Sequence, residues 1–358
     1  MSSLKKVILT TGGTGGHIYP ALAVASRLQE RNIDVLFVGT DIRMEKEIVP
    51  KAGFRFIGLH IAPPRTIKNL FGYIKGMIKG FKIVLKEKPD AIIGFGNYIS
   101  VPVVVAGILL GKKVYLQEQN ANLGGTNKLF YRFVQKTFLA FDKTYDDIPI
   151  KYQHKVMVTG NPLRDEIYHV DIEDEREKIK VTPEEKIVLI TGGSLGAQEI
   201  NEGVLKNWDR FLENKNIRLY WATGEKNYDS IVKKIDKIKM QDTVRPYFEN
   251  MINIMAAADL VICRAGALTI SEIIELGKPS IIIPYSSIKV GQYDNGKLLK
   301  DAGAAFMYKN SQASLAIQKA LELLENDNEL SDMRMNIRNL KKNDPSGKIV
   351  ETLDIWRN

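Results

Sequence analysis

Residues 7–16 read VILTTGGTGG, and residues 187–196 read IVLITGGSLG. Each stretch is an uncharged apolar run, typical of a buried strand, that ends in a glycine-rich turn and is followed by a helix-like segment. Because glycine has no Cβ, such a turn can adopt positive φ, and its N–H groups can approach a ligand closely. In front of a helix these N–H groups form an anion site. One copy could serve packing alone, but two copies in equivalent settings predict two domains of a nucleotide-binding type.

Short apolar runs and helix-like segments alternate through the rest of the chain. One helix is expected at 19–31, with Pro20 near its first position, and another at 343–358. The further expected strands are 35–39, 91–95, 114–116, 136–140, 218–222, 243–246, 260–263 and 280–284. This alternation predicts an α/β protein with parallel, doubly wound sheets, whose ligands bind at the carboxyl ends of the strands. The length of 358 residues favours two domains, with the polar segment 165–183 near their junction.

The composition, 44% hydrophobic and 26% charged residues, is that of an ordinary globular protein. The single cysteine, Cys263, lies in an apolar run, so we expect a packed thiol and no internal disulfide. Only three apolar residues follow Lys5 and Lys6, which is too few for a signal peptide. The longest apolar run, 101–110, is about half of a membrane span. These features predict a cytosolic protein with at most a surface attachment to a membrane.

Basic residues are concentrated in the first half of the chain. Residues 1–160 hold 23 Lys and Arg against 11 Asp and Glu, whereas residues 161–358 hold 28 against 31. This excess predicts a polyanionic partner, which would be a nucleic acid, a phospholipid surface or a phosphorylated substrate. Nucleic acid is the weaker prediction because the sequence has no zinc-finger cysteines and no RNP-type aromatic motif.

Residues 68–86 form a basic amphipathic stretch within that half. Lys75, Lys79, Lys82 and Lys86 share one face of the expected helix, and apolar residues occupy much of the rest. Such a helix can lie on an anionic membrane. An ordinary core helix with a solvated lysine face is the alternative, which this pattern alone favours. Three glycines spaced four residues apart lower the helix propensity and suggest that contacts set the shape of the segment.

The first glycine turn matches neither of the common phosphate-binding motifs. Ile18 breaks the G-x-G-x-x-G pattern, and no Lys-Ser/Thr pair follows as in a P-loop. Asp41, at the end of the second expected strand, is one weak indication of an NAD-dependent oxidoreductase. The four histidines show no metal-ligand spacing, so we expect no metal site and no cofactor.

Taken together, the loops closely resemble those of the MurG family, the bacterial UDP-N-acetylglucosamine transferases of peptidoglycan synthesis. The matching stretches are 11–21, 94–100, 118–120, 126–127, 160–164, 192–197, 263–272 and 292–295. Each is weak alone, but the set follows the family order over nearly the whole chain. The resemblance implies a GT-B fold, in which two Rossmann-like domains face each other across a cleft. The implied domains are 1–160, completed by a returning helix at about 343–358, and 161–342.

The resemblance also implies a reaction and its partners. The family transfers GlcNAc from UDP-GlcNAc to the muramyl 4-hydroxyl of lipid I, with inversion at the anomeric carbon, and so forms lipid II. The acceptor, undecaprenyl-pyrophosphoryl-MurNAc-pentapeptide, is held in the membrane. The implied location is therefore peripheral, on the cytoplasmic face of the cell membrane. The implied partner is an anionic membrane surface, and no nucleic acid is expected. Binding to such a surface would explain both the basic first half and residues 68–86.

By resemblance, the second domain binds the donor. Glu272 would accept hydrogen bonds from the ribose hydroxyls, and the N–H groups of residues 267–269 would face the diphosphate. Arg164 and Ser194 would bind the diphosphate as well, and Phe248 would read the uracil edge through its backbone. The full implied set of substrate-binding residues is Thr14, Gly15, Gly16, Asn120, Arg164, Ser194, Phe248, Ala267, Leu268, Thr269, Ile270, Ser271, Glu272 and Gln292.

Several of these residues have ordinary structural interpretations without the family. Arg164 beside a proline turn is equally well a surface ion pair. Ser194 fits a simple helix cap, a role that is compatible with binding a ligand as well. Glu272 fits a partly exposed helix position. By resemblance Gln292 would bind the sugar hydroxyls, but without the family nothing in the sequence marks it as a binding residue.

His17 is the candidate general base. An alcohol that attacks an anomeric carbon must lose its proton, and an imidazole suits that task. Alternatively, His17 donates to the pyrophosphate of the acceptor and positions it. The glycine turn around His17 favours the two roles about equally. The second copy of the turn, which carries Ser194, fits the UDP side together with Arg164 and Glu272. The anion expected at the first copy is therefore the acceptor pyrophosphate.

The chain departs from the family at three positions. Gln117 replaces a usual His, Asn97 a usual Gly, and Leu195 a common Gln. Since Gln cannot shuttle a proton, an essential base at position 117 is not expected. Three alternatives stay open: another GT-B glycosyltransferase with a lipid acceptor, a UDP-GlcNAc 2-epimerase, and a basic surface-binding protein without enzyme activity.

Overall fold

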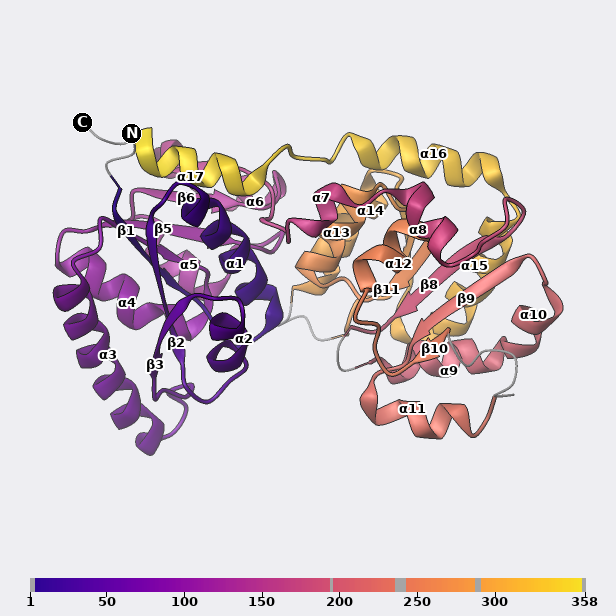
Figure 1. The fold of residues 1–358 in the computed structure, drawn as a ribbon, viewed down its shortest axis with the longest axis horizontal. Helices are drawn as coiled ribbons and strands as arrows, with labels where there is room; N and C mark the ends of the chain where they lie inside the picture. The colour runs from indigo at the N-terminus through magenta and orange to yellow at the C-terminus, as the bar shows by residue number, and fades with distance from the viewer. Residues whose placement is uncertain (1–3, 194–195, 236–242, 287–290, 356–358) are drawn as a thin grey trace. The chain divides into compact units, whose positions relative to one another are not determined.

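The computed structural model describes residues 4–193, 196–235, 243–286 and 291–355. The chain divides into two compact units, which are Met1–Arg164 with Lys342–Asn358 (unit 1) and Asp165–Lys341 (unit 2). Each unit is built around a parallel sheet with helices on its faces (Figure 1). The polar segment expected near a domain junction begins unit 2 as the short helices α7 (Glu166–His169) and α8 (Ile172–Lys178).

The sheet of unit 1 has seven described strands in the order β3-β2-β1-β4-β5-β6-β7. They are β1 (Lys6–Thr10), β2 (Asp34–Thr40), β3 (Arg55–Leu59), β4 (Ala91–Gly94), β5 (Lys113–Glu118), β6 (Lys136–Leu139) and β7 (Val156–Val158). The sequence did not predict β3 and β7, which are the edge strands. Their side chains are mostly half-buried, and β3 begins with the exposed Arg55, so neither has the fully apolar run of a central strand.

The two faces of this sheet are covered by different helices. Val7 and Leu9 of β1 pack with α1 (Gly15–Glu30) and α17 (Pro345–Ile355). Ile8, which points to the other face, packs with α3 (Ile67–Glu87) and α4 (Asn97–Leu109). The smaller elements of unit 1 are α2 (Glu45–Lys51), α5 (Gly125–Phe130), α6 (Lys143–Asp146) and η1 (Ile150–Lys155).

Helix α1 begins four residues before its expected start at position 19, so that prediction was wrong. Thr14 is the extended N-cap residue, and Pro20 lies inside the helix instead of near its first position. Two glycines, which are poor helix formers, occupy the first turn and hid the start in the sequence. As a consequence, His17 lies in the first turn of α1.

Unit 2 has six described strands in the order β10-β9-β8-β11-β12-β13. They are β8 (Lys186–Thr191), β9 (Ile217–Ala222), β10 (Val244–Arg245), β11 (Leu260–Cys263), β12 (Ser280–Ile282) and β13 (Ala305–Met307). Its helices after α8 are α9 (Gln198–Lys206), α10 (Trp208–Glu213), α11 (Glu225–Val232), α12 (Met251–Ala257), α13 (Ala267–Leu276), α14 (Gln292–Asp301), η3 (Asn310–Gln312), α15 (Ala313–Leu324) and α16 (Asp327–Arg338). One core holds Trp208 and Trp221 with β8, α9 and α15. The edge strand β13, with two half-buried side chains, was not predicted.

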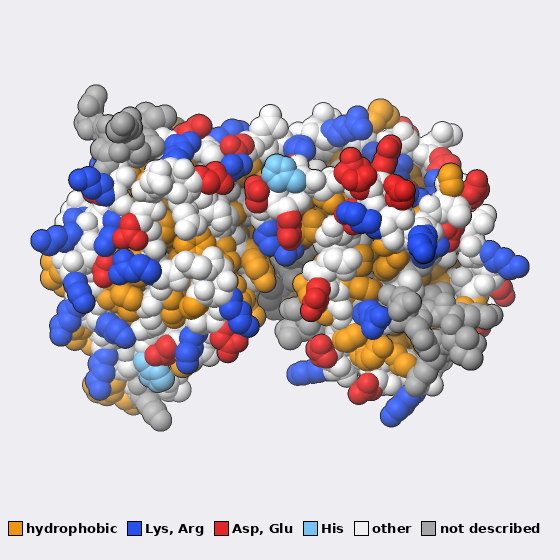
Figure 2. Space-filling view, viewed as in Figure 1, with side chains coloured by type: hydrophobic (Ala, Val, Ile, Leu, Met, Phe, Trp, Pro, Cys, Tyr) orange, Lys and Arg blue, Asp and Glu red, His pale blue; other side chains and the backbone are white. Residues whose placement is uncertain are grey.

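Helix α3 buries only part of its apolar surface, which corrects the core-helix alternative for residues 68–86. A row of large hydrophobic side chains along the helix stays exposed: Ile67, Leu70, Phe71, Ile74, Ile78 and Leu85. Phe71 and Ile78 keep 64% and 54% of their surface exposed. Lysines flank this row, and Figure 2 shows basic and hydrophobic side chains together along the edge of unit 1 where α3 lies.

The opposite face of α3 packs closely through its glycines. A Cβ at Gly76 would lie 2.2 Å from the Ile61 Cγ2 atom, and one at Gly80 would lie 3.0 Å from Pro102 of α4. The glycines therefore permit close packing and explain the low helix propensity of the sequence. No helix within the described ranges is long and apolar enough to cross a membrane.

In both sheets the strand order reverses at the strand that precedes a glycine turn. In unit 1 the reversal lies between β1 and β4, and in unit 2 between β8 and β11. Ligands of open α/β sheets bind at such switch points, outside the carboxyl ends of the strands. The loops after these four strands are therefore where each unit is expected to bind a ligand.

Candidate functional site

The glycine turn after β1 is held by a buried carboxylate. Glu45 accepts hydrogen bonds from Gly13 N at 3.0 Å and from Thr40 N at 3.1 Å. Gly12 and Gly13 have φ of +154° and +91°, and a Cβ on Gly12 would lie 2.1 Å from the Glu45 Oε1 atom. Only glycine fits this turn, because the carboxylate lies directly against it. No sequence signal pointed to Glu45.

We expect Glu45→Gln to destabilise unit 1. An amide has one oxygen, so one of the two N–H groups would face an N–H donor instead of an acceptor. Urea unfolding followed by circular dichroism should show a loss of about 1–3 kcal/mol in the free energy of unfolding. The matched control is Glu47→Gln, an exposed position in the same helix, which should change it by less than about 0.5 kcal/mol. Equal stability of the two variants would contradict this role of Glu45.

The start of α1 leaves backbone donors for an anion. The first helical hydrogen bond runs from Ile18 N to Thr14 O, so the N–H groups of Gly15 and Gly16 precede it. Thr14 is exposed at the same place. The structure thus brings Thr14, Gly15, Gly16 and His17 together at the carboxyl end of β1.

His17 is partly buried, and its ring is hydrogen-bonded to the Gln119 side chain and to the backbone of Phe95. Its Nδ1 atom lies 2.8 Å from Oε1 of Gln119, which follows β5. Gly96, with φ of +84°, approaches the ring closely, since a Cβ there would lie 3.6 Å from the His17 Cε1 atom. Burial lowers the pKa of His17, and the negative charges of Glu118 and Glu45 oppose this effect only in part. A lowered pKa favours the neutral form of the imidazole.

The loop after β5 is organised by Glu118, which is 2% exposed. One carboxylate oxygen accepts from Asn120 N and Asn120 Nδ2, and the other accepts from Gly124 N and Asn127 Nδ2. This fixes the predicted site residue Asn120 in the loop that also carries Gln119. Glu118 belongs to the stretch that resembled the family, but its supporting role became visible only in the structure.

Arg164 lies in unit 1, although the boundary expected from the sequence assigned it to the second domain. Its guanidinium carbon is 5.3 Å from the centroid of the Tyr19 ring, and Tyr19 is two residues beyond His17 in α1. A cation in this position stacks on the aromatic face. The structure therefore brings Arg164 to the same helix as His17.

In unit 2, the predicted residues gather at the start of α13, directly after β11. Gly266 is the N-cap, and Ile270 N donates to Gly266 O at 2.9 Å. The N–H groups of Ala267, Leu268 and Thr269 precede this bond and point out of the helix start at the switch point of the sheet. They are the donors that an anion binds at a helix N-terminus.

Other predicted residues of α13 have different surroundings. Glu272 is half-buried, and its charge adds to burial in raising the pKa of Cys263 to about 12, which fits a packed thiol. The side chain of Ile270 is fully buried, and Ser271 Oγ donates to Ala267 O at 2.9 Å. The Ile270 side chain thus packs in the core, and the Ser271 hydroxyl is hydrogen-bonded to the backbone of its own helix.

Two further predicted residues of unit 2 are Phe248, which follows β10, and Gln292, which follows β12. Phe248 is buried, with its ring against Tyr220 at a centroid distance of 5.8 Å. Gln292 begins α14, and its Oε1 atom accepts from Tyr285 N at 2.9 Å. Ser194 and Leu195 lie outside the described residues.

Arg264 organises the loop between β11 and α13. It is 8% exposed, donates to Ile283 O and Pro284 O, and pairs with Glu199 of α9 at 2.7 Å. It also donates to the Asn310 side chain. Arg264 lies in a stretch that resembled the family. The sequence did not show that its side chain bonds to the segments that follow β8 and β12.

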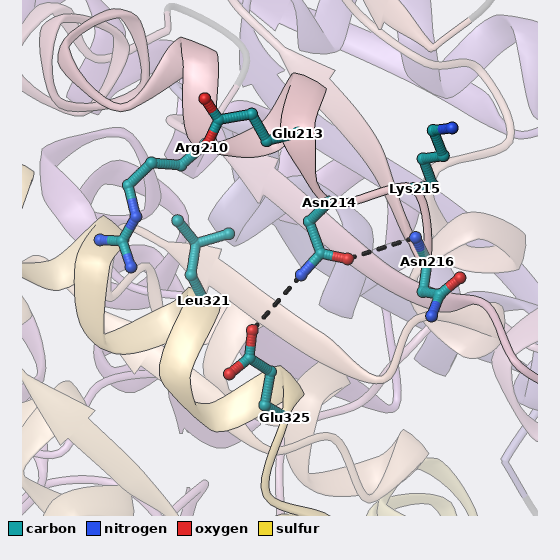
Figure 3. A pocket seen from close by; sticks show the side chains of 7 residues that line it. All are labelled: Arg210, Glu213, Asn214, Lys215, Asn216, Leu321 and Glu325. Atoms are coloured by element: carbon teal, nitrogen blue, oxygen red, sulfur yellow. Dashed lines mark hydrogen bonds between the residues drawn. The ribbon is translucent and has the colours of Figure 1, made fainter.

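A hollow of about 450 Å³ lies elsewhere in unit 2, between the end of α10 and α15 (Figure 3). Asn214 donates to Glu325 there and accepts from Asn216 N, and the two asparagines directly precede β9. The hollow therefore lies at the amino end of the sheet, away from the switch point. Among the described residues, no group of three or more His, Cys, Asp or Glu side chains could hold a metal ion.

Comparison with known proteins decides the family. Residues 7–139 match the glycosyltransferase family 28 N-terminal domain, and residues 187–348 match the family 28 C-terminal domain. The chain belongs to glycosyltransferase family 28. Within this family it is 57% identical, over the full length of both chains, to the UDP-N-acetylglucosamine–N-acetylmuramyl-(pentapeptide) pyrophosphoryl-undecaprenol N-acetylglucosamine transferase of Fusobacterium nucleatum. The enzyme of the same name from Acetivibrio thermocellus is 35% identical over 99% of both chains.

Solved structures agree with this family 28 assignment. The crystal structure of Acinetobacter baumannii MurG superposes with a TM-score of 0.77 at 26% identity, over 98% of this chain and 99% of that one. A UDP-N-acetylglucosamine 2-epimerase from Listeria monocytogenes shares the fold, with a TM-score of 0.71 at 14% identity, over 98% and 96% of the chains. The GT-B fold and the family resemblance predicted from the loops are confirmed.

Proposed function

We propose that this family 28 glycosyltransferase transfers GlcNAc from UDP-GlcNAc to the muramyl 4-hydroxyl of lipid I, which gives lipid II. The observation that carries the proposal is the 57% full-length identity to a relative named for this transfer. Two helix starts at switch points support it, because the donor and the acceptor each contain a pyrophosphate that needs an anion site.

The start of α13 is proposed as the site of the leaving group. As the acceptor oxygen bonds to the anomeric carbon, the bond from that carbon to the UDP oxygen breaks, and charge builds on the diphosphate. The N–H groups of Ala267, Leu268 and Thr269 stabilise that charge. Glu272 accepts hydrogen bonds from the ribose hydroxyls. Ser194, Arg164, Phe248 and Gln292 are the further proposed contacts to the diphosphate, the uracil and the sugar.

The start of α1 is proposed as the acceptor site. The N–H groups of Gly15 and Gly16 bind the acceptor pyrophosphate, with Thr14 and Asn120 beside them. His17 removes the proton from the 4-hydroxyl as that oxygen attacks. Support for this role comes from the burial of His17, which lowers its pKa and so favours the neutral ring that a base needs.

Helix α3 is proposed to hold the enzyme on the cytoplasmic face of the cell membrane, where the lipid acceptor is anchored. The exposed hydrophobic row described above would enter the interface between headgroups and acyl chains. The flanking Lys75, Lys79, Lys82 and Lys86 would contact anionic headgroups, each contributing about 1 kcal/mol.

We expect the double substitution Ile74→Glu and Ile78→Glu to lower binding to vesicles of mixed phosphatidylglycerol and phosphatidylethanolamine at least about tenfold. The two side chains are 47% and 54% exposed, so folding should be little affected. Sedimentation with the vesicles measures the bound fraction. The matched control is Ile150→Glu, an 86% exposed position on η1 of the same unit. If the control lowers binding as much as the double variant, α3 is not the contact surface.

Three incubations separate the proposed transfer from its rivals. With labelled UDP-GlcNAc and lipid I, the label should move to the lipid fraction. With diacylglycerol in place of lipid I, it should not, whereas a diacylglycerol glycosyltransferase would label that lipid. With no acceptor, an epimerase would form UDP-ManNAc, and the proposed enzyme would not. A surface-binding protein without activity would show no thermal stabilisation by UDP.

A further inference from the structure

Three side-chain amides lie in a row behind His17, from Gln117 near the end of β5, Gln119 in the loop after it and Asn161 after β7. Gln117, Gln119 and Asn161 are 0%, 2% and 3% exposed. His17 Nδ1 contacts Gln119 Oε1, Gln119 Nε2 contacts Gln117 Oε1, and Gln117 Nε2 contacts Asn161 Oδ1 at 3.1 Å. Gln117 is the residue that replaces the usual His of the family, so this row is made of groups that do not titrate.

Backbone carbonyls fix the direction of every amide in the row. Gln119 Nε2 donates to Phe95 O at 3.1 Å and to Gln117 O at 3.3 Å, and a carbonyl oxygen can only accept. Gln117 Nε2 likewise donates to Glu118 O at 3.2 Å. Asn161 Nδ2 donates to Gln119 O at 3.2 Å. A flipped amide at any of the three positions would set oxygen against oxygen.

Because Gln119 Nε2 is the donor, Gln119 Oε1 is the acceptor that faces the His17 ring. The Nδ1 atom must then carry the proton, and in the neutral ring the lone pair lies on Nε2. We propose that Gln119, oriented by Gln117 and Asn161, is a positioning residue that holds His17 in the Nδ1–H tautomer and leaves Nε2 as the proton acceptor. The catalytic use of Nε2 rests on the function proposed above.

The three amides hold this tautomer of His17 without adding a charge beside the ring. Glu118 and Glu45 are the carboxylates whose charge reaches the His17 ring, but their oxygens accept from backbone and amide N–H groups, and the ring nitrogen contacts an amide instead. A carboxylate at the position of Gln119 would favour the imidazolium form. A neutral amide selects the tautomer while burial keeps the ring unprotonated, which is the state a base needs.

The test reads the tautomer directly, without substrate. The full chain contains four histidines, so ¹⁵N-histidine labelling gives few signals, and His17→Asn identifies those of His17. At a pH where the ring is neutral, the expected spectrum shows a protonated Nδ1 and an unprotonated Nε2. A protonated Nε2 in the unsubstituted protein would overturn the proposal, whatever the enzyme catalyses.

Gln119→Met supplies the second measurement, because methionine has a similar length and no hydrogen-bond acceptor of comparable strength. The expected result is a mixture of tautomers and a fall in kcat of at least about tenfold, with the Kd for UDP unchanged. Gln153→Met, a partly buried position on η1 of the same unit, is the matched control and should change neither. If Gln119→Met keeps a pure Nδ1–H ring and full kcat, Gln119 does not position His17. If the unsubstituted protein shows the expected tautomer but transfers no GlcNAc to lipid I, the proposed function is refuted and the positioning role of Gln119 is not.

Discussion

Replacing His17 with asparagine is expected to lower kcat for GlcNAc transfer by about 10²–10⁴-fold, with a smaller change in the acceptor KM. The reason is the position of the ring in the first turn of α1, where Gln119 contacts Nδ1. In the proposed tautomer, Nε2 is the proton acceptor. Initial rates at varied lipid I concentration separate kcat from KM. The matched control is His154→Asn, an exposed histidine on η1 of the same unit, which should keep full activity.

The pH profile gives an independent measurement of the same role. A base must be neutral, so kcat/KM should rise with pH as His17 loses its proton and then level off. Because burial lowers the pKa of His17, this rise should be centred below about 6.5, the ordinary value for histidine. If His17→Asn instead raises the acceptor KM and leaves kcat and the acidic limb intact, His17 binds the pyrophosphate and is not the base.

The second large effect is expected at Glu272. Glu272→Gln should weaken UDP binding roughly 10- to 150-fold, because hydrogen bonds to a charged group contribute about 1.5–3 kcal/mol. Isothermal titration with UDP measures the Kd, and Glu322→Gln, an exposed position on α15 of the same unit, is the matched control.

Deoxyribose analogues make this prediction specific to the ribose. The unsubstituted protein should bind 2′-deoxy-UDP less tightly than UDP, and the Glu272→Gln variant should discriminate less between the two ligands. Equal discrimination by both proteins would mean that Glu272 does not contact the 2′-hydroxyl.

Much of the fold could be predicted from the sequence because its central strands contain short apolar runs, and β1 and β8 end in glycine turns. The strands that it did not predict, β3, β7 and β13, lie at sheet edges, where half-buried side chains leave no such run. The start of α1 was misplaced because glycines serve the turn and the first helical turn at once.

The candidate site was predictable only in part, for a physical reason. Residues that would touch a ligand lie in short loops next to strand ends, where motifs are visible. Their supports are distant in sequence: Glu45 lies 32 residues from Gly13, and Asn161 lies 44 residues from Gln117. The exposure of the apolar face of α3 was equally hidden, because its periodicity fits a buried helix as well as an exposed one.

The most direct test of the account is the product formed from purified enzyme, UDP-GlcNAc and lipid I. Mass spectrometry should show lipid I gaining one N-acetylhexosamine residue for each UDP released, and NMR should show a β linkage to the muramyl 4-hydroxyl. Release of UDP without a change in lipid I, an α linkage, or conversion of UDP-GlcNAc in the absence of lipid I would contradict an inverting transfer to this acceptor.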